Sequence, residues 1–444
     1  MRLAVEKGIS LWLLLVFVPE PVFASPLEFA GIGSVAAAKS SAVIASETGP
    51  ESSYYNPAAL AFSGTLQLQL SYQHLASKLS YGGPYAEQSS EIDLADLGAF
   101  AVSAPITPWL SMGLALQSPL KSALSIDAPS IEDPHFPYYE NRSQRISLFP
   151  ALALRPLRWL SLGLALNYFS SLRGSLRTAM GGSRATEASL SAQAESYTSF
   201  IAGLRVVPLK HWRFALVYRH AFSVPYEIVT ENLVGGTPLD IAMKGYALAS
   251  PHTLELGVAY QNRFILAEFD LGYQFFSVLH SPFVQVDATV SSIDLGLRIP
   301  KKVYNDAIFT RASLSLNHAL SQHDLFTQHF GFSLTTSMLN EQTGRSNLLD
   351  APKLGLSTGS SIRFEKLFGH PLILSAHAAL SYMRSVRSDK VISSIDQARA
   401  NPNALADEDE TVSGMQLSNP GYPYIVGEAI ALSIGLSVAV EFEP

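Results

Sequence analysis

Apolar and polar residues alternate along most of the chain after residue 62. The clearest alternating runs are residues 66–73, 110–117, 160–167, 239–244, 265–274 and 430–441. Successive side chains of a β-strand point to opposite faces, so each run predicts a strand with one apolar and one polar face. We expect about fourteen such strands, many of them about 10 to 16 residues long, against roughly 5–6 in an ordinary globular strand. That length suits strands that cross a membrane at a tilt.

Two architectures place amphipathic strands in series. A soluble β-sandwich or propeller buries its apolar faces, whereas a membrane barrel turns them toward lipid. The polar parity of these runs is mainly Ser, Gly, Ala, Gln and Asn, and charged residues make up only 15% of the chain, against roughly 25% in soluble domains. The pattern therefore favours an all-β fold, a transmembrane antiparallel β-barrel of about 14 strands. Glu268 and Asp270 should then face the lumen, since a one-residue slip would turn both carboxylates toward lipid.

A barrel of this size has a lumen too wide for wall side chains to fill. It holds either a water-filled channel or a plug, and the residues before the first strand are a candidate for the plug. Gly31 and Gly33 lead into small helix-forming residues, and Asn56-Pro57-Ala58 predicts a tight turn. Short turns are also expected near Pro251 and Asn262.

The first residues have the pattern of an export signal. Arg2 and Lys7 precede a ten-residue apolar core at 9–18, which is too short to span a bilayer. Val22-Phe23-Ala24 fits a signal-peptidase site, so we place cleavage after Ala24; an uncleaved N-terminal anchor is the alternative. The predicted organisation is a signal peptide at 1–24, a hatch at 25–63 and a barrel at 64–444 with long loops near 121–142 and 387–427. Export of such a chain indicates the periplasm or outer membrane of a Gram-negative bacterium.

Composition excludes several kinds of site. The formal net charge of −7 argues against nucleic-acid binding, and the absence of cysteine rules out disulfides, thiolate metal sites and cysteine nucleophiles. The segment 355–359 fits a nucleophile-elbow pattern, but it lies within an alternating run instead of a strand-turn-helix. His318, His323 and His329 lack the spacing of a helical metal pair. We therefore expect no catalytic residues, no metal and no cofactor.

The order of export signal, Gly-x-Gly, small-residue helix, Asn56-Pro57-Ala58 and barrel resembles the FadL/TodX family of outer-membrane transporters of long-chain fatty acids and hydrophobic compounds. A second similarity is the run 251–260, which is similar to a recurrent strand of that family, together with the long strand that follows it. The C-terminus departs from the usual barrel pattern, because Glu443 and Pro444 follow the last aromatic residue.

The resemblance implies a 14-stranded barrel whose lumen is closed by a hatch. Gly31, Gly33, Asn56, Pro57 and Ala58 would then be structural residues of the hatch. It also implies that a hydrophobic ligand, a long-chain fatty acid or an aromatic hydrocarbon, is captured from outside and released sideways into the bilayer. The expected partners are this ligand and the lipid and lipopolysaccharide of the outer membrane, with the protein as a monomer.

Two groups of residues are candidates for ligand passage. A strand-interior proline removes a ladder donor, so Pro150 and Pro225 are candidates for a lateral opening; each could equally mark a bulge or a strand end. Phe136, Tyr138 and Tyr139 lie in a long connection and could capture ligand, although an aromatic girdle at the membrane interface would explain them as well.

Other functions remain open at this point. A general diffusion porin should show opposed basic and acidic residues around a water-filled constriction, and charge inside these strands is sparse. A structural or adhesive outer-membrane barrel is a further alternative.

Overall fold

The computed structural model of the 444-residue chain describes most of the barrel and the segment before it. The described residues are 31–82, 89–121, 124–126, 136, 139, 143–181, 184–234, 237–278, 285–290, 293–294, 304–321, 324–339, 349–367, 369–389 and 424–442. The predicted signal peptide, most of the 387–427 loop and Glu443-Pro444 lie outside them. Within this described part, no helix is long and apolar enough to cross a membrane.

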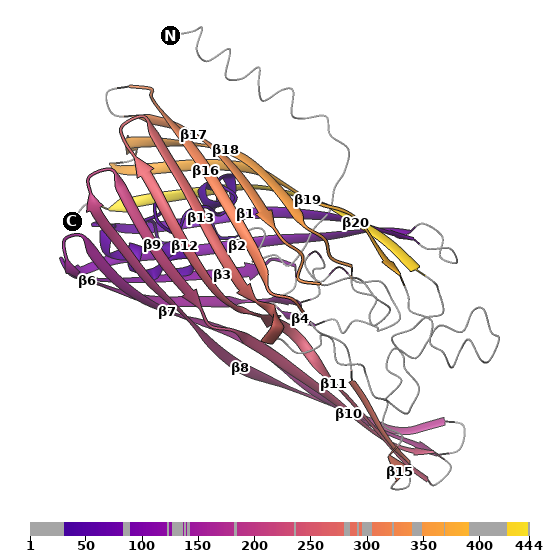
Figure 1. Cartoon of the computed structure of the whole chain (residues 1–444). Helices are drawn as coiled ribbons and strands as arrows, with labels where there is room; N and C mark the ends of the chain where they lie inside the picture. Colours follow the sequence, from indigo (N-terminus) through magenta and orange to yellow (C-terminus); the bar gives the residue numbers. More distant parts are fainter. Residues whose placement is uncertain are drawn as a thin grey trace.

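Fourteen strands among the described residues form a closed antiparallel barrel (Figure 1). The last strand pairs with the first from Leu66↔Phe442 to Gly82↔Val426, which closes the wall and leaves it no free edge. The barrel strands are β1 (Leu66–Gly82), β2 (Ser89–Thr107), β3 (Leu110–Pro119), β6 (Ser147–Leu157), β7 (Leu160–Gly181), β8 (Arg184–Leu209), β9 (Trp212–Arg219), β12 (His252–Gln261), β13 (Ile265–Phe275), β16 (Ala307–Ala319), β17 (Leu325–Thr335), β18 (Lys353–Leu367), β19 (His370–Asp389) and β20 (Tyr424–Phe442). The fold and strand number predicted from the alternation are confirmed.

The remaining elements lie outside this ring of strands or within it. Beyond one end of the wall, β10 pairs with β11 and with β7, and β11 pairs with β14. Their bounds are β10 (Phe222–Val234), β11 (Thr237–Ser250), β14 (Gln285–Val290) and β15 (Ile293–Asp294), with a separate pair β4 (Leu124–Ile126) and β5 (Ser143–Arg145). The helices are α3 (Ser34–Ala38), α4 (Ser52–Tyr55), η1 (Pro57–Phe62) and η2 (Phe276–Val278).

The turn expected at Pro251 is wrong. Pro251 separates β11 from β12, but β9 pairs with β12 and β10 with β11, so the chain runs on in one long hairpin. Proline lacks the N–H that a ladder needs, and here it interrupts a strand without reversing it. At Asn262 the chain does reverse: the Asn262 side-chain oxygen accepts hydrogen bonds from the backbone N–H groups of Phe264 and Ile265.

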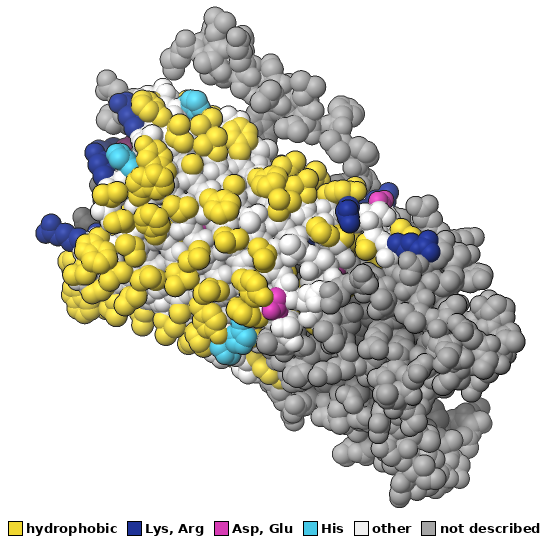
Figure 2. Space-filling view, viewed as in Figure 1, with side chains coloured by type: hydrophobic (Ala, Val, Ile, Leu, Met, Phe, Trp, Pro, Cys, Tyr) yellow, Lys and Arg dark blue, Asp and Glu magenta, His cyan; other side chains and the backbone are white. Residues whose placement is uncertain are grey.

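The outer surface of the wall is apolar. Figure 2 shows hydrophobic side chains covering the wall in view, with Lys and Arg at its two ends. Leu70 and Leu436 are 60% and 63% exposed, although large aliphatic side chains normally lie inside a protein. A continuous apolar belt of this kind is the lipid-facing surface of a membrane barrel.

Aromatic residues mark both edges of this apolar band. Exposed Trp109, Trp159 and Trp212 lie at or beside short hairpin turns at one end. At the other end, outward-facing Tyr72 and Tyr273 donate hydroxyl hydrogen bonds to Asp96 (2.8 Å) and Asp306 (2.9 Å). Rings in lipid with polar ends in the interface are typical of membrane boundaries. We call the tryptophan end the inner end and the tyrosine end the outer end, since the long strands β7 and β8 extend beyond the tyrosines.

The height of the band agrees with a membrane. From Phe264, just before β13, to Tyr273 the chain advances nine residues, or about 30 Å along the strand. A strand tilted by about 40° covers about 23 Å of the membrane normal over that length, close to the roughly 25 Å apolar band of outer-membrane barrels.

Candidate functional site: the barrel lumen

The residues before the first strand lie inside the barrel. This N-terminal segment (residues 31–65) contains α3, α4 and η1, drawn in indigo within the ring of strands (Figure 1). The α3 helix contacts β17 to β20, and η1 contacts β2, β3, β6, β7 and β8, so the segment reaches across the lumen to both sides of the wall. Most of its residues are buried. It therefore occupies the space that the strands alone leave open.

Gly31 and Gly33 form the entry to α3 with left-handed backbones. Their φ angles are 62° and 86°, a region that side-chain-bearing residues rarely adopt. The Tyr55 hydroxyl accepts from the Ile32 N–H at 2.9 Å, and the Gln117 amide of β3 donates to the Gly31 carbonyl at 3.1 Å. This bend therefore connects the start of the segment to its own α4 and to the wall.

Asn56, Pro57 and Ala58 form the predicted turn, and all three are buried. The Asn56 side-chain oxygen accepts from the Ala58 N–H at 3.1 Å, and its amide donates to the Ile44 carbonyl at 2.8 Å. Pro57 is the first residue of η1, where its missing N–H is not needed. The Ser161 hydroxyl of β7 donates to the Ala58 carbonyl at 2.8 Å. The turn is thus attached both to the segment and to the wall.

Two wall glycines allow this turn to approach the strands. Gly163 of β7 and Gly203 of β8 are paired across the ladder. A methyl group on Gly163 would lie 2.2 Å from the Ala58 nitrogen, and one on Gly203 would collide with the Asn56 side chain. The backbone of the turn therefore rests directly on the wall, where no larger residue fits.

Acidic and basic side chains of the wall bind the backbone of the N-terminal segment. Asp270 and Glu268 face inward, as the alternation predicted, and accept hydrogen bonds from the N–H groups of Val43 (3.0 Å) and Ala45 (2.6 Å). Arg219 donates to the carbonyls of Tyr54 (2.7 Å) and Tyr55 (3.0 Å). The guanidinium of Arg219 is charged, so its two hydrogen bonds are stronger than neutral ones.

One carboxyl group of the segment itself is deeply buried. Burial raises the pKa of Glu51 to about 8, and the nearby Glu47 contributes in the same direction. Burial likewise raises the pKa of the Tyr55 hydroxyl above its ordinary value. Glu51 is therefore mostly protonated at neutral pH while the segment is docked.

The inward face of the wall changes character along the barrel axis. On β1, buried Gln69 lies beside Gly33 of the N-terminal segment, and buried Gln73, Leu75, Ser77 and Leu79 follow on the same parity toward the outer end. The same change occurs from Ser103 to Leu97 on β2 and from Ser313 to Phe309 on β16. On these three strands the inward face is therefore more polar beside the segment and more apolar toward the outer end, whereas the wall from β3 to β12 meets the segment with buried apolar residues such as Phe149, Ile201 and Val217.

A set of buried apolar side chains fills the outer part of the lumen, and we call it the outer apolar cluster. Its members are Leu75, Leu79, Ala95, Leu97, Phe136, Tyr139, Leu349, Ala351, Met383, Ala429 and Ala431. Two of the three aromatics that the sequence suggested for ligand capture belong to it, and Tyr138 lies outside the described residues. The Tyr139 hydroxyl hydrogen-bonds Ser381 (2.8 Å), and Ser77 donates to the Tyr139 carbonyl (3.1 Å). These bonds hold Tyr139 inside the barrel and away from the lipid interface.

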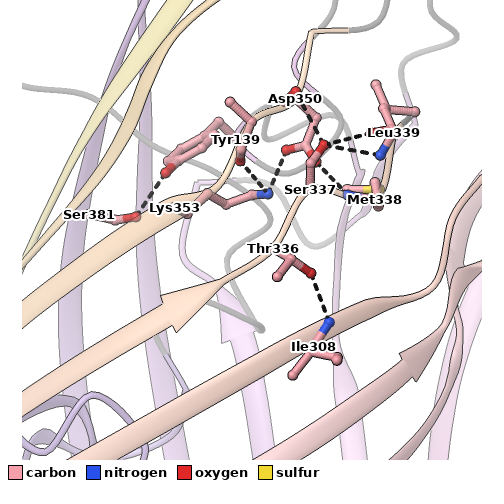
Figure 3. Close-up of polar contacts among 10 residues, drawn as sticks. Tyr139, Ile308, Thr336, Ser337, Met338, Leu339, Asp350, Lys353 and Ser381 are labelled. Carbon is pink, nitrogen blue, oxygen red and sulfur yellow. Dashed lines mark hydrogen bonds and ion pairs between the residues drawn. The ribbon is translucent and has the colours of Figure 1, made fainter. Parts of the chain in front are cut away.

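A buried ion pair borders this cluster (Figure 3). The Lys353 ammonium lies 2.5 Å from an Asp350 carboxylate oxygen, and both side chains are almost fully buried. Asp350 also accepts from the Met338 N–H (2.8 Å) and the Ser337 hydroxyl (2.9 Å). The sequence analysis missed this pair, although Lys353 shares the inward parity of the small residues that follow it on β18.

The two candidate prolines lie in different settings. Pro150 lies inside β6, and the β6–β7 pairing passes from Leu148↔Tyr168 to Ala151↔Ala165, so the stretch at Phe149 and Pro150 is not paired to β7. Pro225 lies at a register shift between β10 and β11, beyond the wall. Pro150 is therefore the candidate that coincides with an interruption of the barrel ladder.

Residues weighed for other chemistry have structural partners here. Ser357, from the nucleophile-like run, donates to the Ala38 carbonyl at 2.9 Å. The two ring nitrogens of His329 contact the hydroxyls of Ser315 (2.8 Å) and Ser361 (3.0 Å). His323 lies outside the described residues, and within the described part no group of three or more His, Asp or Glu could hold a metal ion.

The geometry defines a closed membrane barrel with an internal segment, and solved structures share this fold. A Pseudomonas aeruginosa FadL homologue aligns over 96% of this chain and 99% of its own, with a TM-score of 0.58 and 14% identity. The Pseudomonas putida toluene transporter TodX aligns over 94% and 100%, with a TM-score of 0.53 and 13% identity. The CymD monoaromatic hydrocarbon channel aligns over 96% and 98%, with a TM-score of 0.52 and 12% identity. No family model and no curated protein matches the chain. At these identities the likeness establishes the fold, and it is the fold that the resemblance implied.

Proposed function

We propose that this protein takes up hydrophobic small molecules across the outer membrane, as a transporter of the FadL/TodX type. The observation that carries the proposal is the change from a polar to an apolar inward face toward the outer end of β1, β2 and β16, for example from Gln73 to Leu75 and Leu79 on β1. A water-filled porin needs polar walls throughout, whereas an apolar molecule gains free energy from an apolar lining. The fold shared with a toluene transporter and a hydrocarbon channel supports the same function.

The N-terminal segment acts in this proposal as the hatch. The buried turn at Asn56, Pro57 and Ala58 holds it in place and does not touch the substrate. Its bonds to Asp270, Glu268 and Arg219 keep the inner lumen shut to ions. A ligand that enters through the outer apolar cluster therefore has to leave by another route or displace this segment.

The lateral opening is assigned to the interruption at Pro150. Phe149, the neighbour of Pro150, is fully buried and packs edge-on against Tyr54 of the N-terminal segment at 5.1 Å between ring centroids. A small movement of Tyr54 would change the packing behind the unpaired stretch of wall. The hatch and the opening are thereby mechanically linked.

The remaining parts of the proposal concern location and partners. An export signal cleaved after Ala24 directs the chain to the outer membrane of a Gram-negative cell. The protein works there as a monomer, in contact with phospholipid and lipopolysaccharide, and it carries out no chemistry on its substrate.

The test compares the full chain with a variant lacking residues 25–62. In liposomes, the full chain should admit a labelled alkyl-aromatic hydrocarbon but not a small sugar, and it should conduct almost no ions in planar bilayers. The deletion should produce a steady open pore that passes the sugar. Sugar entry through the full chain at porin-like rates would refute the proposal, and unchanged conductance after the deletion would reject the hatch.

A further inference from the structure

The ion pair of Asp350 and Lys353 borders the outer apolar cluster. Asp350 lies between Leu349 and Ala351, which both belong to the cluster, and Lys353 is paired across β18 and β19 with Met383, another member. Charged side chains are seldom this buried unless they form an ion pair. The pair therefore sets the charge at the border of the apolar space.

Both charges are already engaged. Besides its 2.5 Å contact with Asp350, the Lys353 ammonium donates to the Ala351 carbonyl at 3.2 Å. The Asp350 carboxylate also accepts hydrogen bonds from the Met338 N–H and the Ser337 hydroxyl, which fix its position in addition to the contact with Lys353. The donors and acceptors converge from the 337–339 and 349–353 segments (Figure 3). The Lys353 ammonium thus has its partners in the neighbouring residues Asp350 and Ala351.

A second inward cation is engaged in the same way. Arg311 of β16 forms an ion pair with Glu255 at 2.9 Å, and its guanidinium lies 4.1 Å from the centre of the Phe309 ring. Among the described inward cations, Lys353 and Arg311 therefore have acidic partners, and Arg219 is bound by the carbonyls of Tyr54 and Tyr55. A free fatty acid would have to displace a carboxylate or leave its own charge unpaired in apolar surroundings, which is costly.

We infer that this lumen selects uncharged hydrophobic molecules, such as alkyl-aromatic hydrocarbons and esters, over free fatty acids, and that Asp350 is the specificity-determining residue. This inference rests on the proposed function and narrows its substrate class. Asp350 neutralises Lys353, which would otherwise be an attractive partner for a ligand carboxylate at the edge of an apolar site.

Substitution of Asp350 separates charge from shape. Asp350→Asn keeps a side-chain oxygen for the Met338 N–H but removes the negative charge, which leaves Lys353 available to an anionic ligand. The double variant Asp350→Asn with Lys353→Met removes both charges and serves as the matched control. Removing both partners avoids the cost of a single unpaired buried charge.

The experiment measures equilibrium binding of labelled palmitic acid, its methyl ester and hexadecylamine to the full chain in lipid nanodiscs, with empty nanodiscs subtracted. The wild type should bind the ester at least about tenfold more tightly than the acid or the amine, a difference of about 1.4 kcal/mol. Asp350→Asn should bind the acid at least about tenfold more tightly than the wild type does, and the double variant should lose that gain.

The outcomes distinguish the selectivity for uncharged ligands from the proposed uptake of hydrophobic molecules. If the wild type binds acid and ester equally, the selectivity inference is wrong while hydrophobic uptake stands. If it binds none of the three above the empty nanodiscs, the proposed function fails as well. The wild-type measurements test the selectivity for the ester over the acid even if Asp350→Asn does not assemble. If the Asp350→Asn variant assembles and gains no affinity for the acid, the role of Asp350 is rejected.

Discussion

A single added methyl group on the wall should loosen the N-terminal segment without altering any residue of that segment. In the Gly163→Ala variant the new methyl would lie 2.2 Å from the Ala58 nitrogen and 2.3 Å from the Pro57 carbonyl carbon. An ordinary contact is at least 3.4 Å, so the backbone of the turn has to move by about 1 Å. Backbone atoms cannot rotate away as a flexible side-chain end can.

The expected cost has two parts. Overpacking of a close contact typically costs about 1–3 kcal/mol, and loss of the Ser161 hydroxyl bond to the Ala58 carbonyl adds about 1 kcal/mol. The sum of about 2–4 kcal/mol lowers the ratio of docked to undocked segment by about 30- to 1000-fold. Barrel pairing should be retained, since a small side chain is compatible with a strand.

Single-channel recording in planar bilayers measures this ratio as the fraction of time spent open. Gly163→Ala should open far more often than the wild type. The control is Gly355→Ala, whose added methyl would meet the Ser333 hydroxyl and no backbone atom within 3 Å; it should stay closed. If both alanine variants are as closed as the wild type, the turn does not need the glycine pair and the docking argument is wrong.

Three further predictions concern the opening, a carboxyl group and the outer rim. Pro150→Ala should slow hydrocarbon uptake into liposomes several-fold without raising ion conductance; unchanged uptake would dismiss Pro150 as the opening. The pKa of Glu51 is raised from 4.5 to about 8 in the docked segment, so docking should weaken as pH rises from about 5 to about 8 and then level off. Open time should follow that rise, and Glu51→Gln should abolish the slope. Exposed Lys78 and Arg384 lie on the outer side of the tyrosine edge, so changing both to Gln should reduce the anionic lipid retained in native mass spectrometry.

Matched substitutions control two of these tests. Pro105→Ala changes a proline of β2 at another irregular site in the wall and should leave uptake unchanged. Changing Lys210 and Arg263, at the inner end, to Gln removes the same charge as the rim variant. If it removes as much lipid, the outer rim is not a specific lipid contact.

The strands could be predicted because one face of each meets a uniform solvent. Lipid accepts only apolar side chains, so alternation along β1 or β20 shows both the strand and its orientation. The inward positions of Glu268 and Asp270 followed from the same argument. The turn at Asn56-Pro57 was also predictable, because its geometry comes from local side-chain bonds.

What the sequence did not reveal depends on long-range partners. Arg219 binds backbone carbonyls about 165 residues away in the chain, and nothing in its own strand indicates them. Lys353 was passed over because an isolated lysine on the small-residue parity looks the same whether it faces water or a carboxylate. At Pro251 the local signal is identical for a turn and for an interrupted strand, and only the pairing of β9 with β12 distinguishes them.

The N-terminal segment contributes no strand to the sheet, and its attachment to the wall has a consequence for biogenesis. The β1–β20 seam is complete without it, and Asp270, Glu268 and Arg219 bind its peptide groups through side chains alone. The barrel can therefore close first, and the N-terminal segment can enter the lumen afterwards as a late step of folding. A newly inserted molecule would conduct ions until its N-terminal segment docks. The rate of this docking would therefore limit how fast a cell can insert new molecules without harm.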